Sequence, residues 1–231
     1  MKSTRKKWFR CIKWFLKIFV RKTKFIYLGE KIEGPAIILS NHSAASGPLA
    51  YELYFNDSFR FWGTHEMNDG LISTYKYLTK TYYHKKKHWN IHLARLFCLI
   101  AAPLCNLFYK GLNLISTYQD TRFRRTLKES LKTLNNGSKL IIFPEASENG
   151  YFKELTKFHE GFVVLLEYCK KHQLNLPVYV AYFISDEKIC VLDKPQTINY
   201  FLNLGLSREE LAKQLKERCN ELGNKSIEQL K

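Results

Sequence analysis

Two polar runs follow apolar stretches of the chain, and their residue types could do acid–base chemistry. Asn41-His42 follows apolar residues 35–40, and Glu145 follows the apolar run 139–143. A histidine directly after a buried strand is well placed as a general base, because its unperturbed pKa lies close to neutral pH. Ligands of α/β sheets bind at the ends of strands. The sequence therefore predicts a site where these two runs meet, with His42 as the base.

These runs resemble motifs of the glycerolipid acyltransferases, the lysophosphatidic-acid or 1-acyl-glycerol-3-phosphate type. That family carries Asn-His-x-x-x-x-Asp and, further along the chain, Phe-Pro-Glu-Gly, a Phe-x-x-Gly and a strand near Pro-Val. Four blocks of this chain match in the same order: Asn41-His42, residues 143–145, residues 158–161 and Pro177-Val178. The resemblance runs from about residue 25 to residue 192, which is most of the chain.

The resemblance implies a reaction and the residues for it. In the family, the histidine removes a proton from an acceptor hydroxyl, which then attacks an acyl thioester or acyl phosphate. A positioned general base contributes roughly 10²–10⁴-fold to such a step. Carried over by position, His42 is the catalytic base, and the expected substrate-binding residues are Asn41, Ser46, Glu145, Ala146 and Ser147. No cofactor and no metal is expected; the thioester of coenzyme A or of acyl carrier protein is the co-substrate.

The chain departs from the family at the residue that orients the histidine. Gly47 stands where the family has Asp, and glycine has no side chain to hold an imidazole. Loss of the orienting Asp from a Ser-His-Asp triad costs about 10⁴-fold. Ser46, a backbone carbonyl or Glu145 could take its place. Two hypotheses follow: an acyltransferase acting on a lysophospholipid or related glycerolipid, or a catalytically impaired relative that binds or scaffolds lipids.

Three further departures concern the groups that would bind the acceptor. Ala146 replaces the family's Gly, and Ser147-Glu148 replaces its Thr-Arg. Thr117-Tyr118 stands where the family commonly has an Arg for the acceptor phosphate. Two positions expected to bind phosphate therefore carry no cation.

Short apolar runs alternating with helical patterns predict the elements that position these residues. Strands are expected at residues 25–29, 35–40, 112–117, 139–143, 177–184 and 189–192. A helix over 121–135 stops at Asn136-Gly137, and another over 207–222 opens with the capping box Ser207 to Glu210. This alternation predicts an α/β fold: a mixed, mostly parallel sheet flanked by helices. Residues 25–231 form one domain of this kind.

The charge of the chain predicts a polyanionic partner. The 231 residues include 37 Lys and Arg against 21 Asp and Glu, a net charge of +16. Ten of the basic residues, and no acidic one, lie within residues 1–29. A basic segment at one end favours membrane lipids and an anionic membrane surface. Nucleic acid is not expected, because no base-stacking motif, helix-turn-helix or zinc module accompanies the charge.

Residues 1–24 are predicted to form a cationic amphipathic anchor that lies in the membrane interface. Six cations share one helical stripe, at Lys6, Arg10, Lys13, Lys17, Arg21 and Lys24. Large aromatic and aliphatic residues fill the remaining surface, which is typical of an interfacial helix. The alternative is a helix packed on the protein's own core. The expected location is the cytoplasmic face of a membrane, in monotopic contact, with a role in phospholipid biosynthesis; acyl carrier protein is a further candidate partner.

A second apolar stretch, residues 93–108, allows two interpretations. It contains Pro103 and, at this length, is too short to span a bilayer. A buried helix pair and a re-entrant or monotopic contact are equally compatible with it. His84, His88 and His92 lie nearby at helical spacing, but Lys85, Lys86 and Lys87 would repel a metal ion. The six cysteines form no C-x-x-C pair and are expected to be reduced thiols of a cytosolic compartment.

Overall fold

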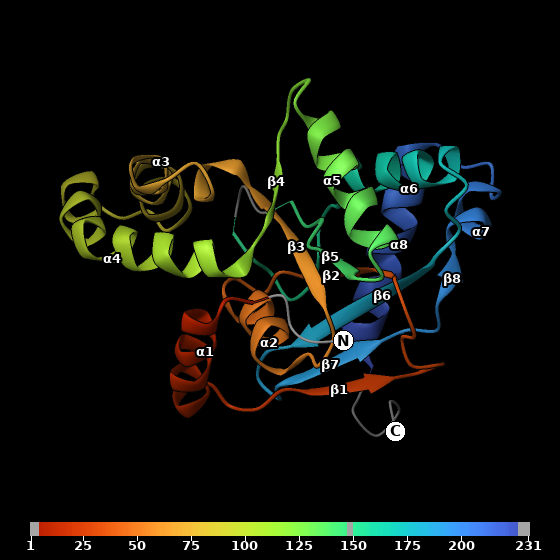
Figure 1. Cartoon of the computed structure of the whole chain (residues 1–231), viewed down its shortest axis with the longest axis horizontal. Coiled ribbons are helices and arrows are strands. Elements are labelled where there is room, and N and C mark those ends of the chain that lie inside the picture. The colour runs from red at the N-terminus through yellow and green to blue at the C-terminus, as the bar shows by residue number, and fades with distance from the viewer. Residues whose placement is uncertain (1–4, 147–149, 226–231) are drawn as a thin grey trace.

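The computed structural model describes residues 5–146 and 150–225 and shows an α/β fold. Its sheet has the strand order β1-β7-β6-β2-β5-β3-β4, with β8 paired to β6 (Figure 1). The strands are β1 Lys24–Tyr27, β2 Ile37–Ser40, β3 Phe59–Thr64, β4 Ile115–Thr117, β5 Lys139–Ile142, β6 Pro177–Ile184, β7 Ile189–Leu192 and β8 Gln196–Thr197. Only the pairings of β6 with β7 and β8 are antiparallel. The predicted fold class, a mixed and mostly parallel sheet, is confirmed.

Apolar side chains from alternate strand positions form a core on each face of the sheet. On one face Ile37 and Leu39 pack with α5 Phe123–Asn135, α6 Gly161–Lys171 and α8 Arg208–Asn224. On the other face Ile38 packs with the helix α2 Ser46–Tyr54 and with Phe9 of the helix α1 Lys7–Phe19. The short helix α7 Ile198–Leu202 follows β8. Because β2 is buried on both faces, its sequence is a continuous apolar run.

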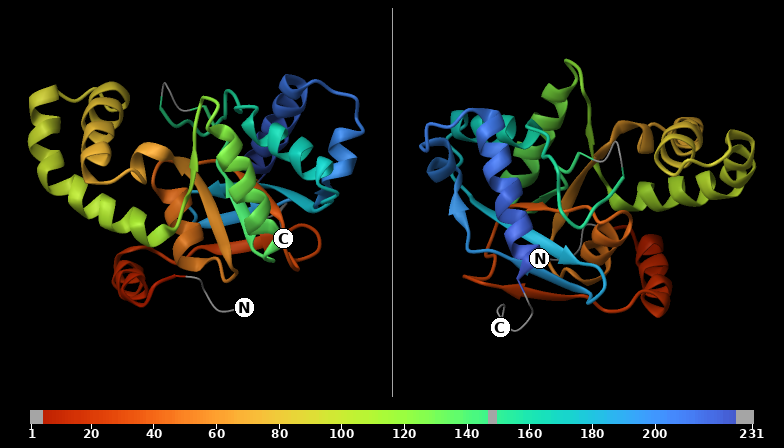
Figure 2. Two further views of the ribbon diagram at one scale, coloured as in Figure 1. Left: turned by 45° about the horizontal axis from the view of Figure 1, so that its top comes forward. Right: turned by 180° about the vertical axis from the view of Figure 1, so that it is seen from behind.

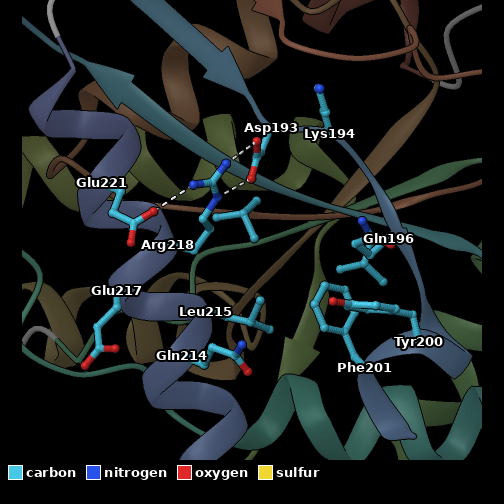
Figure 3. Close-up of a pocket in the computed structure, with 12 residues that line it drawn as sticks. Asp193, Lys194, Gln196, Tyr200, Phe201, Gln214, Leu215, Glu217, Arg218 and Glu221 are labelled. Atoms are coloured by element: carbon cyan, nitrogen blue, oxygen red, sulfur yellow. Dashed lines mark hydrogen bonds and ion pairs between the residues drawn. The ribbon is translucent and has the colours of Figure 1, made fainter. Parts of the chain in front are cut away.

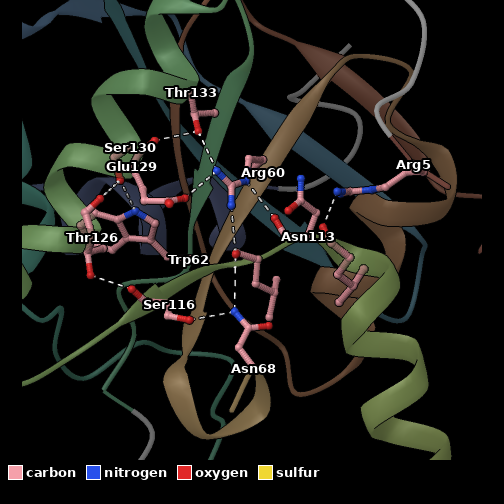
Figure 4. Close-up of polar contacts among 12 residues, drawn as sticks. Arg5, Arg60, Trp62, Asn68, Asn113, Ser116, Thr126, Glu129, Ser130 and Thr133 are labelled. Atoms are coloured by element: carbon pink, nitrogen blue, oxygen red, sulfur yellow. Dashed lines mark hydrogen bonds and ion pairs between the residues drawn. The ribbon is translucent and has the colours of Figure 1, made fainter. Parts of the chain in front are cut away.

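Each predicted strand has a counterpart in the structure, although the strand expected from residue 112 begins only at Ile115, because α4 continues to Leu112. Two strands were not predicted, the internal strand β3 and the short β8. The α5 helix ends before Gly137, which adopts a φ of 75°, and Ser207 and Glu210 form the capping box of α8. The internal strand β3 lies between β5 and β4. Its buried Phe59 and Phe61 alternate with Arg60, whose guanidinium donates to the carbonyls of Asn113 and Leu114 and pairs with Glu129 (Figure 4).

A helical hairpin projects from the sheet between β3 and β4 (Figures 1 and 2). It comprises η1 His65–Met67, α3 Leu71–Lys76, the π-helix η2 Tyr77–Lys86 and α4 Ile91–Leu112. The α4 helix packs its small residues Ala94, Cys98 and Ala102 inward and continues through Pro103. Residues 93–108 alone are shorter than a membrane span, but the helix that contains them has 22 residues. By length and composition alone, α4 is the one described helix that could cross a membrane.

The N-terminal helix α1 packs on the protein's core as well as exposing an apolar face. Phe9 is fully buried against Gly111, where an added Cβ would lie 1.9 Å from the Phe9 ring. The buried carboxylate of Glu52 pairs with Arg5 at 2.7 Å and with Lys13 at 2.9 Å. Arg5 also donates to a carbonyl at the end of α4 (Figure 4). Part of the predicted cationic stripe therefore binds the protein itself, as the alternative interpretation of this segment proposed.

Candidate functional site

The side chain of Asn41, just after β2, forms hydrogen bonds with the neighbouring strand β6. Its side-chain carbonyl accepts the Phe183 N–H at 2.6 Å, and its amide donates to the Phe183 carbonyl at 3.1 Å. The side chain is buried, and both of its polar atoms are used in this way. Asn41 therefore fixes the backbone that carries His42. The expected contact of its side chain with substrate would require these two bonds to open.

A sharp turn follows His42 and leads directly into α2. Ser43 and Ala44 both adopt the left-handed region, with φ of 46° and 53°. The chain thereby folds back, so that a Cβ on Gly47 would lie 2.4 Å from the His42 carbonyl oxygen and 3.2 Å from that of Asn41. At such distances, a side chain at position 47 would force the backbone of this turn to shift. In this backbone, the carboxylate that the family pattern has there cannot be accommodated.

Glu145 lies beside His42, because β5 and β2 are parallel neighbours and both residues follow the carboxyl ends of their strands. Its buried carboxylate accepts the backbone N–H of His42 at 2.9 Å. A bridge between Glu145 and Phe158 and the 3.0 Å bond from Ala146 N–H to the Lys157 carbonyl hold this segment. The predicted meeting of the two runs is thus observed, although Glu145 contacts the His42 backbone and not its ring.

Aromatic rings enclose the His42 imidazole. The ring of Tyr151 stacks on it at 4.9 Å and 27°, and Phe143 contacts it edge-on at 5.0 Å. Its Nδ1 is buried and, among the residues that the structure describes, makes no hydrogen bond. Neither Ser46 nor Glu145 therefore replaces the missing Asp as a partner of this nitrogen. A base acting on substrate from this ring would use Nε2.

Burial lowers the pKa of His42 to about 4. Polar contacts of the ring with the Ala44 and His42 backbones oppose this shift, and the positive charge of Lys86 adds to it. The ring is therefore neutral at physiological pH, which is the form that can accept a proton. Burial also raises the pKa of Glu145, against the opposing effects of the His42 and Phe152 backbones and of Lys86.

Two residues of this site were not predicted from the sequence. Tyr151 comes from the segment after β5, and Lys86 is the last residue of η2. The Lys86 ammonium lies 5.7 Å from the centroid of the Tyr151 ring. Lys86 therefore brings a cation to a site whose expected phosphate-binding positions carry none. Of the other predicted residues, Ser46 begins α2 and Ala146 follows Glu145, whereas Ser147 lies outside the described residues.

A separate hollow of about 390 Å³ lies between β6, β8 and α8 (Figure 3). The ion pair between Arg218 and Asp193, with Nε and Oδ2 2.5 Å apart, crosses one side of it, and Tyr200 and Phe201 form another. None of the predicted site residues lines this hollow. It therefore has no part in the chemistry expected of His42.

Comparison with known proteins adds no identification. No protein-family model matches this chain, and no curated protein matches it in sequence.

Proposed function

We propose that this protein is a membrane-associated acyltransferase that moves a fatty acyl group onto a hydroxyl of a lysophospholipid or related glycerolipid. The observation that carries the proposal is the juxtaposition of His42 and Glu145 at the carboxyl edge of β2 and β5, joined by the 2.9 Å hydrogen bond. Strand ends of parallel sheets are where ligands of such folds bind. The motif resemblance assigns these two residues to the same site.

The reaction needs one proton acceptor and one good leaving group. Neutral His42 takes the proton of the acceptor hydroxyl while its oxygen attacks the acyl carbonyl carbon. A carbon–oxygen ester bond forms, and the carbon–sulfur bond of the thioester breaks. The thiolate leaves and recovers the proton from His42. With an acyl phosphate donor, the acyl carbon–oxygen bond breaks instead and phosphate leaves.

Two exposed apolar faces support the membrane part of the proposal. On α1, Trp14 and Phe19 are 70% and 71% exposed; on α4, Leu96 and Ile100 are 67% and 73% exposed. The covered face of α4 contacts α3 and η2, and α1 lies on the opposite side of α4 (Figure 1). Both faces can therefore meet one leaflet in a monotopic contact. Exposed apolar patches bordered by cations are typical of membrane-binding surfaces.

The second candidate, a lipid-binding or scaffolding protein without activity, is favoured by one observation. The Nδ1 of His42 has no hydrogen-bond partner among the described residues, so no described carboxylate takes the place of the orienting Asp. The two candidates differ in product formation. Purified protein in vesicles is incubated with labelled acyl-CoA and acyl-carrier-protein donors and a panel of lysolipids, and products are read by mass spectrometry. A new ester supports the acyltransferase; lipid binding without any ester supports the second candidate.

A further inference from the structure

The His42 ring is held by aromatic contacts from two directions. Tyr151 lies over its face, with ring centroids 4.9 Å apart, and Phe143 meets it at 60°. The terminal torsion of a histidine is broad, so packing or hydrogen bonding must select one orientation. Nδ1 makes no hydrogen bond within the described part of the chain, so packing against these two rings restricts the orientation of the imidazole.

We propose that Tyr151 is a positioning residue that holds the His42 imidazole in its orientation. It would take over this role from a carboxylate at position 47, for which the turn leaves no room. This inference rests on the proposed function. An orienting Asp sets the angle of the imidazole and stabilises the imidazolium that forms. Stacking on Tyr151 supplies the first property directly.

Lys86 connects Tyr151 to the helical hairpin. Its ammonium lies over the Tyr151 ring at 5.7 Å, and it is the last residue of the π-helix η2. A π-helix is rare and frequently occurs at functional sites. The ring that covers His42 therefore contacts both the imidazole and a cation from the hairpin. The place of Tyr151 is set by the tertiary fold and not only by its own loop.

Among the described residues, two charged groups affect His42, so its titration can report on Tyr151. Lys86 approaches from η2, and Glu145 binds the His42 backbone from the end of β5. The turn of residues 43–47 carries no charged side chain. Burial is the largest cause of the low His42 pKa. Removing the Tyr151 ring exposes the imidazole and should raise its pKa towards 6.5.

The test is a nuclear magnetic resonance titration of the His42 ring in the full-length protein, which requires no substrate. Wild type and Tyr151→Phe should titrate near 4 and show ring-to-ring nuclear Overhauser contacts between His42 and residue 151. Tyr151→Ala, which exposes the imidazole, should titrate closer to 6.5. Tyr151→Leu, which fills space without a ring, should change the contact between His42 and Phe143. Tyr200→Ala, which removes an exposed tyrosine of α7, is the matched control and should leave His42 unchanged.

Activity supplies the second readout. Tyr151→Leu should lower kcat about 10²-fold, the scale of a small misplacement of a catalytic group, without changing KM for the acyl donor, and Tyr151→Phe should restore it. The proposal is overturned if Tyr151→Ala leaves the His42 titration unchanged and Tyr151→Leu leaves its contact with Phe143 unchanged, even when activity falls. A protein without acyl transfer in which the titration still shifts as expected would contradict the proposed function and leave the positioning role intact.

Discussion

The carbonyl oxygen of His42 occupies the space that a side chain on Gly47 would need. An ideal Cβ at position 47 would lie 2.4 Å from that oxygen, far inside van der Waals contact. The contact arises because Ser43 and Ala44 turn the chain through two left-handed residues before α2 begins. The glycine is thus required by the backbone of the site, and an Asp introduced there would distort the turn that presents His42.

We therefore expect Gly47→Ala and Gly47→Asp to lower the free energy of unfolding by about 1–3 kcal/mol, the usual range for overpacking. The matched control is Gly161→Ala in the first turn of α6, where an added Cβ meets its nearest neighbour at an ordinary 3.4 Å. Gly161→Ala should be neutral or slightly stabilising, because alanine favours helix. Urea unfolding measures both. Equal stabilities of Gly47→Ala and wild type would disprove the steric argument.

The low pKa of His42 predicts how stability depends on pH. Above pH 6.5 the ring is neutral in both the folded and the unfolded chain, so it contributes no pH dependence. Between 6.5 and about 4, the unfolded chain binds a proton that the folded protein does not. The free energy of unfolding should therefore fall by about 3 kcal/mol over this window, at 1.36 kcal/mol per pH unit.

The comparison that isolates this effect is wild type against His42→Asn, unfolded with urea at several pH values. The variant should lose less stability than wild type between pH 6.5 and 4. Parallel curves for the two proteins would mean that His42 titrates normally in the folded state.

Two substitutions of Glu145 test its hydrogen bond with the His42 N–H. Glu145→Gln keeps an acceptor oxygen at the same place, so stability should change little. Glu145→Ala leaves the N–H without its partner and should lower the free energy of unfolding by about 1–3 kcal/mol. Glu154→Ala, an exposed residue of the following segment, serves as the control. If Glu145→Gln is as damaging as Glu145→Ala, the carboxylate charge matters more than the hydrogen bond.

Membrane binding should depend on the exposed faces of both α1 and α4. Trp14→Glu and Ile100→Glu should each weaken binding to anionic vesicles about tenfold or more, since about 1.4 kcal/mol of apolar burial corresponds to a factor of ten. Leu206→Glu, near the start of α8 and away from these helices, should have no effect. Vesicle sedimentation measures the affinity. Unchanged binding of both variants would contradict a leaflet contact by these faces.

Point substitutions serve this test better than removal of residues 1–24. Deletion would also remove Arg5 and Lys13 and leave the buried carboxylate of Glu52 without these two cations. Breaking a buried ion pair in this way typically destabilises a protein by about 3–5 kcal/mol. A loss of membrane binding would then be confounded with unfolding. High salt should weaken wild-type binding, because the cations beside these faces attract anionic lipids.

The sequence predicted the meeting of His42 and Glu145 because both follow apolar strands, and the ends of parallel strands meet at one edge. It did not predict Tyr151 or Lys86, since an irregular segment and a π-helix have no regular periodicity that places their side chains. The predicted N-terminal helix is confirmed as α1, yet its sequence pattern could not identify Phe9 as the residue buried beside Gly111. The identity of that face depends on the contact between Phe9 and Gly111 of α4, which lies more than a hundred positions further along the chain.

The most direct test of the central claim is acyl transfer by wild type and His42→Ala, measured side by side with the acceptor that the lysolipid panel selects. Both proteins must first show the same circular dichroism spectrum and the same binding to vesicles. We expect wild type to form the ester and His42→Ala to lose about 10²–10⁴-fold in kcat, the contribution of a positioned general base. Equal rates for the two folded proteins would contradict the role of His42 as the base.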